Sequence, residues 1–370
     1  MTKILVVEDD EKIRKALKRI FKREKYEVLE AENGLIALEQ MAFMPDLVLM
    51  DMMMPEMDGI TAIKKIRESD KYDNIPIITL SAVSDKAKWV EALEEGAKDY
   101  VPKPYDLSEL KARVQNHLEA ATLKKEVEAK NRLLERETEL ASKVQKAILP
   151  RDFNFPGLEV GKFYRPSNNQ LSGDFFDIFR IGDSINFLIA DVCGHGTGSA
   201  LIMAAAKGIL RSQASVSQSP LEIVSAANHL LCEMLGDSEL FLTLVFCIFN
   251  EEKNQLEILS AGHSSVFFIS NKEGIKTIES TGMPLGWFPD ISWEPIKFSF
   301  DHGESLFLCT DGIIEAKEKG GEQFGSKRLI NLLQENSKPD VMIDNIFKQV
   351  EKFCESNFSD DMTMLAVRRK

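Results

Sequence analysis

Acidic residues follow short apolar runs at two places in the N-terminal part of the chain. Glu8 and Asp9 come directly after Ile4–Val7, and Asp51 follows Leu47–Met50. Clustered carboxylates repel one another unless they hold a cation, and oxygen ligands without His or Cys suit Mg²⁺. A magnesium site of this kind favours phosphoryl transfer, because the cation neutralises the charge on the transferred group. We therefore expect a magnesium-dependent phosphoryl site in this part of the chain.

A second set of aspartates recurs beside turns in the C-terminal part. Asp191 and Asp311 each follow an apolar run and precede glycine-bearing turns, and four further aspartates stand in similar contexts: Asp174, Asp177, Asp360 and Asp361. Several aspartates without convincing His or Cys ligands indicate Mg²⁺ or Mn²⁺, here as a two-metal site. Such a metal pair lowers the pKa of a bridging water, and the resulting hydroxide attacks a phosphoester without a covalent enzyme intermediate.

The elements that must position the first set lie in residues 1–118, where short apolar runs alternate with amphipathic segments such as Lys12–Lys22. The runs are Ile4–Val7, Val28–Leu29, Leu47–Met50, Ile77–Leu80 and Tyr100–Val101. Five β/α repeats predict a doubly wound α/β domain, in which a five-stranded parallel sheet has helices on both faces. The carboxyl ends of parallel strands meet at one edge, so we expect Asp51, Ser81 and Lys103 to share a cleft with the first two acids.

These residues resemble the CheY-like receiver family of response regulators over residues 1–118. The spacings from Asp51 to Ser81 and to Lys103 fit the family, as does the Lys103-Pro104 pair. The resemblance implies that Asp51 takes a phosphoryl group from a sensor histidine kinase or a phosphotransfer protein. It also implies the roles of the neighbouring residues: Mg²⁺ binding by Glu8, Asp9, Asp51 and the Met53 carbonyl, phosphoryl contact by Lys103 and Ser81, and switching by Tyr100.

The segment from about 108 to 149 contains no proline or glycine and predicts a long helix, with residues 119–149 as the linker between two domains. Apolar residues recur one heptad apart along it, at Val127, Leu134, Ala141 and Ile148. The same stripe also holds Lys130 and Glu137, so two interpretations stay open. The helix is either a parallel coiled coil that makes the chain a homodimer, or a solitary charged helix packed against one of the domains.

After residue 150 the strand-like runs mostly adjoin one another and the helices come in blocks. The strand-like runs are Asn186–Ala190, Leu242–Phe249, Leu256–Leu259, Ser265–Ile269, Ser305–Cys309 and Met362–Val367. Helices are expected near Ser199–Ala214, Pro220–Leu235 and Asp340–Glu355. This order predicts an α+β layered sandwich over residues 150–370.

Four motifs in this second part resemble the PPM protein phosphatases of the SpoIIE/RsbU type. They are Ser172-Gly-Asp174-Phe-Phe-Asp177, Ala190-Asp191-Val-Cys-Gly-His195-Gly196, Thr310-Asp311-Gly312 and Ser359-Asp360-Asp361-Met-Thr363. The resemblance implies a set of metal ligands: Asp191 for both metals, Asp174 and the Val192 carbonyl for one, and Asp311 with Asp360 for the other. Whether Asp361 shares the role of Asp360 stays open. His195 and His263 are expected to shape loops rather than to catalyse.

Together the two resemblances imply a two-component response regulator that is phosphorylated on Asp51 and regulates its own metal-dependent serine/threonine phosphatase. The substrate implied is a phosphorylated STAS-type anti-sigma-factor antagonist in a partner-switching pathway. The alternative is a non-catalytic adaptor that binds a regulatory protein through a phosphatase-like domain, and the intact aspartates favour the enzyme. A DNA-binding output would need a helix-turn-helix with a basic face, which the sequence after residue 150 does not offer.

The bulk composition argues against nucleic acid or a membrane surface as a partner. The chain has 370 residues, enough for two or three domains, and a formal net charge of −13, which repels phosphate backbones and anionic lipid. Its five cysteines include no C-x-x-C pair and indicate thiols in a reducing compartment rather than disulfides or a zinc site. Neither a signal peptide nor an apolar run long enough to span a bilayer is evident, so we expect a soluble cytoplasmic protein.

Overall fold

The computed structural model describes residues 1–370 except 83–85, 168–170, 195, 237, 264–265 and 336. The side chains of residues 82, 86 and 87 are not described either. The expectation for His195 and the first residue of the strand expected at Ser265–Ile269 therefore lie outside the described ranges. The chain divides into two compact units, residues 1–134 and 135–370, and each is described by itself. None of the helices in the described part of the chain has the length and apolar character that a membrane span needs.

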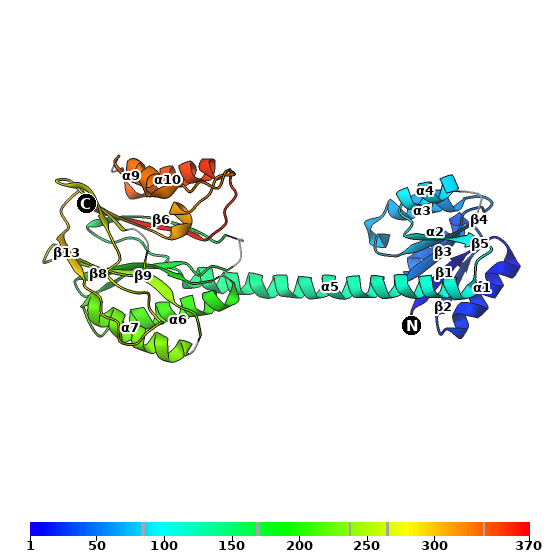
Figure 1. The fold of residues 1–370 in the computed structure, drawn as a ribbon, viewed down its shortest axis with the longest axis horizontal. Helices are drawn as coiled ribbons and strands as arrows, with labels where there is room; N and C mark the ends of the chain where they lie inside the picture. The colour runs from blue at the N-terminus through cyan, green and yellow to red at the C-terminus, as the bar shows by residue number, and fades with distance from the viewer. Residues whose placement is uncertain (83–85, 168–170, 195, 237, 264–265, 336) are drawn as a thin grey trace. The chain divides into compact units, whose positions relative to one another are not determined.

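The N-terminal unit contains a five-stranded parallel sheet, as the sequence predicts (Figure 1). Its strands are β1 (Lys3–Val7), β2 (Glu27–Ala31), β3 (Leu47–Asp51), β4 (Ile77–Ala82) and β5 (Asp99–Lys103). Its helices are α1 (Glu11–Arg23), α2 (Gly34–Gln40), α3 (Gly59–Arg67) and α4 (Lys86–Glu94), with short 3₁₀ turns η1 (Met41–Phe43) and η2 (Asp70–Tyr72). The strand order is β2-β1-β3-β4-β5, so β2 lies on one side of β1 and β3 lies on the other. The point between β1 and β3 is therefore the switch point, where a doubly wound sheet forms its binding crevice.

Helices cover both faces of this sheet, which explains the uninterrupted apolar runs of its strands. Successive side chains of a strand point to opposite faces. In β1, Leu5 and Val7 pack with Ile63 of α3, whereas Ile4 and Val6 pack on the other face with α1 and the beginning of α5 (Leu107–Ile148). Because both sets are buried, Ile4–Val7 forms an uninterrupted apolar run.

The C-terminal unit is a sandwich of two five-stranded antiparallel sheets (Figure 1). One, the β8 sheet, has the order β13-β10-β9-β8-β7, and the other, the β14 sheet, has the order β12-β11-β14-β15-β6. The strands are β6 (Leu158–Arg165), β7 (Phe175–Ile181), β8 (Ser184–Val192), β9 (Leu242–Asn250), β10 (Gln255–Ala261), β11 (Val266–Ser270), β12 (Gly274–Ile278), β13 (Ile296–Ser299), β14 (Ser305–Cys309) and β15 (Met362–Arg369). The helices are α6 (Thr197–Ala214), α7 (Pro220–Leu235), α8 (Asp311–Ile314), α9 (Gly325–Leu333) and α10 (Pro339–Phe353).

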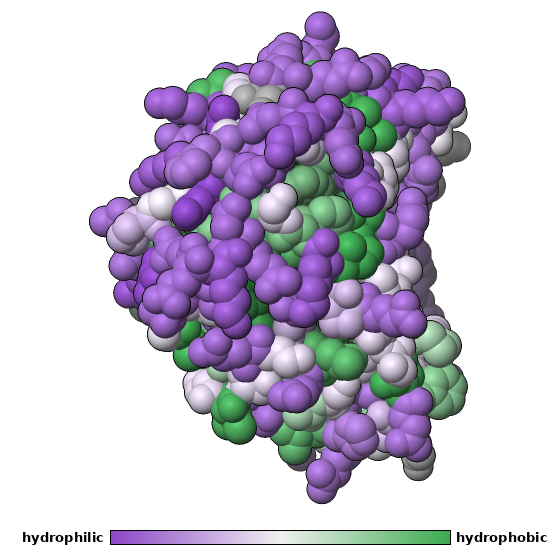
Figure 2. Space-filling model, turned by 90° about the vertical axis from the view of Figure 1, so that its left-hand side faces the viewer, coloured by the Kyte–Doolittle hydropathy of each residue, from purple (hydrophilic) through white to green (hydrophobic). Residues whose placement is uncertain are grey.

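Three apolar layers hold this sandwich together and confirm the predicted α+β architecture. Phe187 and Val245 of the β8 sheet pack against Val266 and Leu308 of the β14 sheet. The outer face of the β8 sheet packs on α6 and α7, and the outer face of the β14 sheet packs on α9 and α10. Outside this core, hydrophilic residues dominate the face seen in Figure 2, with hydrophobic ones in small groups.

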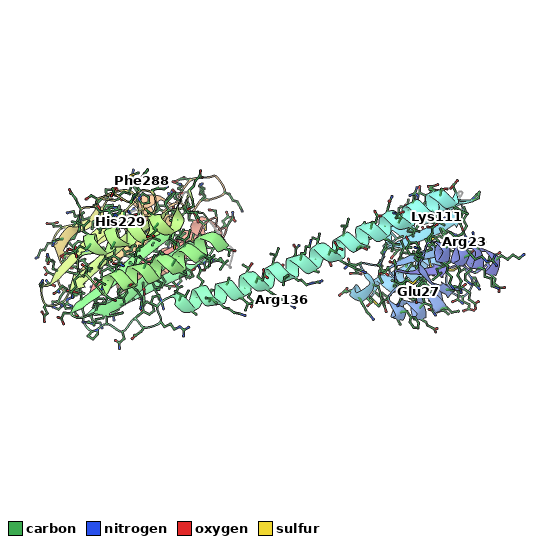
Figure 3. The ribbon with its side chains drawn as sticks, turned by 90° about the horizontal axis from the view of Figure 1, so that it is seen from below. Arg23, Glu27, Lys111, Arg136, His229 and Phe288 are labelled. Atoms are coloured by element: carbon green, nitrogen blue, oxygen red, sulfur yellow. The ribbon has the colours of Figure 1, made fainter. Side chains whose placement is uncertain are left out.

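Helix α5 is the long helix that the sequence predicts. Val127 and Leu134 of its apolar stripe are exposed in this single chain, as are two further apolar residues of the helix, Leu123 and Val144. Side chains of its central turns, among them Arg136, project away from the helix (Figure 3). The coiled coil and the homodimer stay predictions. The last turns of α5 differ, because Ser142 and Gln145 are buried within the C-terminal unit.

Candidate functional site

Three carboxylates meet at the switch point of the parallel sheet. Glu8 and Asp9 follow β1, Asp51 ends β3, and one carboxylate oxygen of each lies within 4.8 Å of the others. Lys103, the last residue of β5, donates from Nζ to Glu8 Oε2 at 2.8 Å and to Asp51 Oδ2 at 2.9 Å. The neighbouring Asp10 does not join the cluster, because its side chain caps α1 through the amides of residues 12 and 13.

The electrostatics of this cluster favour a cation. Burial raises the pKa of Glu8 to about 7, the hydrogen bond from Lys103 opposes that rise, and the negative charge of Asp51 adds to it. One ammonium thus faces three acids, two of them buried. A hard cation with oxygen ligands would remove this excess of negative charge, so the donor set fits Mg²⁺.

The other receiver residues named from the sequence lie just after β3, on β4 and on β5. Ser81 is buried in β4, and its neighbour Leu80 is in register with Asp51. The amide of Met53 donates to Asp51 Oδ1 at 3.5 Å, so the backbone of Met53 borders the carboxylate. Tyr100 lies on β5 with its ring stacked on Trp89 of α4, at 4.3 Å between centroids. Sequence reasoning missed Trp89, since a half-buried tryptophan on an amphipathic helix carries no distinctive spacing.

The second site lies where strands of the two antiparallel sheets end. Asp191 is near the end of β8, and Asp311 follows β14 as the first residue of α8. Together with Val192 and Asp360 they line a pocket of about 410 Å³; its other lining residues are Cys193, Gly194, Phe241, Thr243, Ser359 and Asp361. Among the described residues, three carboxylates lie within 4.8 Å of one another only in the N-terminal unit, so this second group is the more widely spaced.

Asp174 lies fully buried behind this pocket. Its Oδ2 accepts hydrogen bonds from Thr310 Oγ1 and Thr363 Oγ1, each at 2.7 Å. The two threonines belong to the segments that carry Asp311 and Asp361, so Asp174 ties three of the four motifs together. Asp177 of the first motif does not join, because it is buried and forms ion pairs with Lys207 and Arg211 of α6.

Burial and neighbouring negative charge raise the pKa values of three aspartates of the second site. Burial raises the pKa of Asp191 to about 7, and the charges of Asp311 and Asp360 contribute. Burial and the charge of Asp191 raise the pKa of Asp174 well above its ordinary value. For Asp311 the causes of its raised pKa are burial and then the charge of Asp360. Such mutual repulsion shows a deficit of positive charge that divalent cations would fill.

Asp360 and Asp361 occupy different environments. Asp361 is buried, and both of its oxygens accept backbone hydrogen bonds, Oδ1 from Ser167 at 2.7 Å and Oδ2 from Gly173 at 3.1 Å. Asp360 is exposed at the pocket, and its Oδ1 accepts from the Asp361 amide at 2.8 Å. Asp361 therefore anchors the loop before β7, while Asp360 presents its carboxylate to the pocket.

Two glycines allow the backbones around the pocket to approach closely. A Cβ on Gly173 would lie 2.5 Å from the Val192 carbonyl oxygen, and one on Gly312 would lie 1.9 Å from the Asp361 carbonyl oxygen. The signal for both was in the sequence, since each glycine adjoins an aspartate of a motif. The reason why a glycine is needed at each position is the close approach of a second segment, which is evident only from the structure.

Comparisons with known proteins define the class of this chain. Residues 4–115 match the response regulator receiver domain, and residues 182–370 match the family of Stage II sporulation protein E (SpoIIE). The protein is thus a receiver domain fused to a PPM-type phosphatase domain. It belongs to the SpoIIE family, whose match covers half of the chain.

Individual relatives agree with this assignment. The chain is 29% identical over 241 residues to "Phosphoserine phosphatase RsbU" of Bacillus subtilis (strain 168), which covers 63% of this chain and 70% of that protein. It is 30% identical over 266 residues to "Protein IcfG" of Synechocystis sp., where the match covers 63% of this chain and only 41% of the relative. The fold is similar to that of the SiaA-PP2C domain of Pseudomonas aeruginosa, with a TM-score of 0.59, 21% identity, and coverage of 65% of this chain and 99% of that one.

Proposed function

We propose that this chain is a response regulator whose C-terminal unit is a catalytically active, metal-dependent serine/threonine phosphatase controlled by phosphorylation of Asp51. The observation that carries the proposal is the pocket that Asp191, Asp311 and Asp360 line together, where burial and neighbouring negative charge raise the pKa values of Asp191 and Asp311. A non-catalytic adaptor would have no use for such destabilising repulsion. The similarity to a relative named as a phosphoserine phosphatase supports the same activity.

In this proposal the pocket holds two divalent cations, Mn²⁺ or Mg²⁺. Asp191 serves both of them, Asp174 and the Val192 carbonyl serve one, and Asp311 with Asp360 serves the other. When bound, such a pair supplies a nucleophilic water near neutral pH and neutralises the phosphoryl oxygens. Asp361 is assigned to the loop rather than to the cation, because backbone amides already bond both of its oxygens.

For the N-terminal unit we propose that Asp51 accepts a phosphoryl group from a phosphohistidine on a kinase or phosphotransfer protein. Glu8, Asp9 and the Met53 carbonyl would complete the Mg²⁺ site beside it. Lys103 already bonds Asp51 and would pair with an added phosphoryl oxygen. Ser81 and the Tyr100 ring, which stacks on α4, would rearrange in response and so alter the surface next to α5.

The proposed substrate is a phosphoserine or phosphothreonine on a small STAS-type protein, so that dephosphorylation switches the partner to which that protein binds. A direct test is Mn²⁺-dependent phosphate release from such a phosphoprotein by the full chain. We expect Asp311→Ala to lower kcat/KM at least about 100-fold, because losing a metal ligand costs more than the 10–100-fold typical of residues that merely support one.

The matched control is Glu252→Ala, which removes an exposed acid from the turn between β9 and β10 and should leave activity unchanged. Equal, near-zero release by wild type and Asp311→Ala, with the phosphoprotein still bound, would contradict the enzyme and establish the adaptor instead.

A further inference from the structure

The last turns of α5 place one buried polar side chain against the loop that precedes Asp174. Gln145 is only 4% exposed. Its Nε2 donates to the Ser172 carbonyl oxygen at 2.6 Å, and its Oε1 accepts from the Ser172 amide at 3.1 Å. The carboxamide thus donates to the carbonyl and accepts from the amide of the same residue, Ser172. Both bonds together require a donor and an acceptor on one planar group.

From Ser172 the contacts lead directly into the metal pocket. The Asp174 amide donates to Ser172 Oγ at 3.1 Å, and the Gly173 amide donates to Asp361 Oδ2 at 3.1 Å. The Val192 amide donates to the Gly173 carbonyl oxygen at 3.4 Å. Residues 172–174 are therefore held from the β8 strand end, from Asp361 and, through Gln145, from α5.

Packing alone does not explain a glutamine at position 145. The neighbouring Leu149 already packs against the apolar clusters on both faces of the β8 sheet. A buried carboxamide is costly unless its hydrogen bonds are made, so its presence indicates that the bonds to Ser172 matter. Tyr164 strengthens the arrangement, since its hydroxyl donates to Gln145 Oε1 at 3.4 Å.

We propose that Gln145 is a positioning residue for the phosphatase metal site. It fixes the Ser172–Asp174 loop, and thereby keeps Asp174 and the Val192 carbonyl in the arrangement that binds a cation. Because Gln145 belongs to the helix that begins just after β5, a rotation or shift of the end of α5 breaks both bonds to Ser172 and loosens the loop. This inference rests on the proposed function, and it assigns the coupling between the receiver and the phosphatase site to one side chain, Gln145.

The test is Gln145→Met in the full chain, which keeps the volume of the side chain and removes both hydrogen bonds. Its control is Lys146→Met, the same new side chain at the adjacent exposed position. Calorimetric titration with Mn²⁺ should show a 10–100-fold higher Kd for Gln145→Met and an unchanged Kd for Lys146→Met. Phosphate release by Gln145→Met should recover toward the wild-type kcat at saturating Mn²⁺.

Hydrogen exchange gives a readout that does not depend on activity. The Ser172 amide, which donates to Gln145, should exchange faster in Gln145→Met than in the control. If Gln145→Met does not fold, Gln145→Glu takes its place, because it keeps the acceptor for that amide while losing the donor; its Mn²⁺ Kd should lie above that of wild type.

The outcomes separate the two proposals. A folded variant at position 145 that binds Mn²⁺ as tightly as wild type would overturn the positioning role and leave the phosphatase intact. A wild-type chain that neither binds Mn²⁺ nor releases phosphate would instead overturn the proposed function.

Discussion

His263 illustrates how a histidine beside a metal pocket can serve structure alone. It is buried, with Nε2 at 3.1 Å from the Cys309 carbonyl oxygen and Nδ1 at 2.8 Å from Thr243 Oγ1. The carbonyl can only accept, so Nε2 carries the proton and the threonine hydroxyl donates to Nδ1. Burial lowers the pKa of His263 to about 4, which keeps the ring neutral. This geometry favours the loop-shaping role over catalysis.

A pH dependence of stability follows from that lowered pKa. The unfolded chain takes up a proton at His263 below about pH 6.5, whereas the folded chain does so only near pH 4. The contribution of this site is therefore fully present above pH 6.5 and is lost as the pH falls toward 4, by about 3 kcal/mol in total. We expect His263→Gln to be less stable than wild type at pH 7, and its stability to fall less between pH 6.5 and 4. Urea unfolding in the presence of a chelator would measure the stability of the C-terminal unit in both proteins. Parallel profiles of stability against pH for wild type and His263→Gln would refute the prediction.

The aspartate pair at 360 and 361 marks a limit of sequence reasoning at the residue scale. Two adjacent carboxylates are equivalent in a motif, and the resemblance left their roles open. What separates them is the position of two backbone amides, at Ser167 and Gly173, which are almost 200 residues away along the chain. Such long-range hydrogen bonds leave no local trace in the sequence.

At the scale of elements, prediction in the C-terminal unit succeeded for central strands and failed for edge strands. The strands that the sequence analysis did not predict in the C-terminal unit are β6, β7, β12 and β13, and all four lie at the edges of their sheets. An edge strand has fewer neighbours and carries polar residues on its open side. In β12 and β13 exposed and half-buried positions alternate over four or five residues, too short a pattern to stand out. The central strands β8, β9 and β14 are buried almost throughout and were therefore evident.

The turn between β14 and α8 supports a prediction at this scale. We expect Gly312→Ala to destabilise the C-terminal unit by about 3 kcal/mol, because the added Cβ would overlap the Asp361 carbonyl oxygen. It should also weaken Mn²⁺ binding by displacing Asp311.

The control is Gly198→Ala at the start of α6, where a Cβ would meet nothing within 4 Å. Its stability should stay within about 1 kcal/mol of wild type, since alanine suits a helix better than glycine. Thermal unfolding and Mn²⁺ titration of the two variants test this, and equal behaviour would contradict the close approach.

At the scale of the whole molecule, the sequence predicted the receiver domain and the long helix because each depends on a periodic pattern, and the C-terminal domain because its strand-like runs mostly adjoin one another. The receiver shows apolar runs such as Ile4–Val7 alternating with amphipathic segments, and α5 shows a heptad stripe without proline or glycine. The contact between the end of α5 and the Ser172–Asp174 loop was not predicted. Gln145 lies off the apolar stripe, and its partner is the backbone of Ser172, which any residue could supply.

The central claim is that the state of Asp51 sets the activity of the phosphatase. It is tested by Mn²⁺-dependent dephosphorylation of a phosphoserine STAS protein, measured with and without a phosphoryl analogue on the receiver. The matched variant is Asp51→Asn, which keeps the size of the side chain and removes the phosphoacceptor. We predict that the analogue changes kcat/KM of the wild type about 5–150-fold, the usual range for coupled sites, and leaves Asp51→Asn unaffected. Equal wild-type activity in both states would contradict the account.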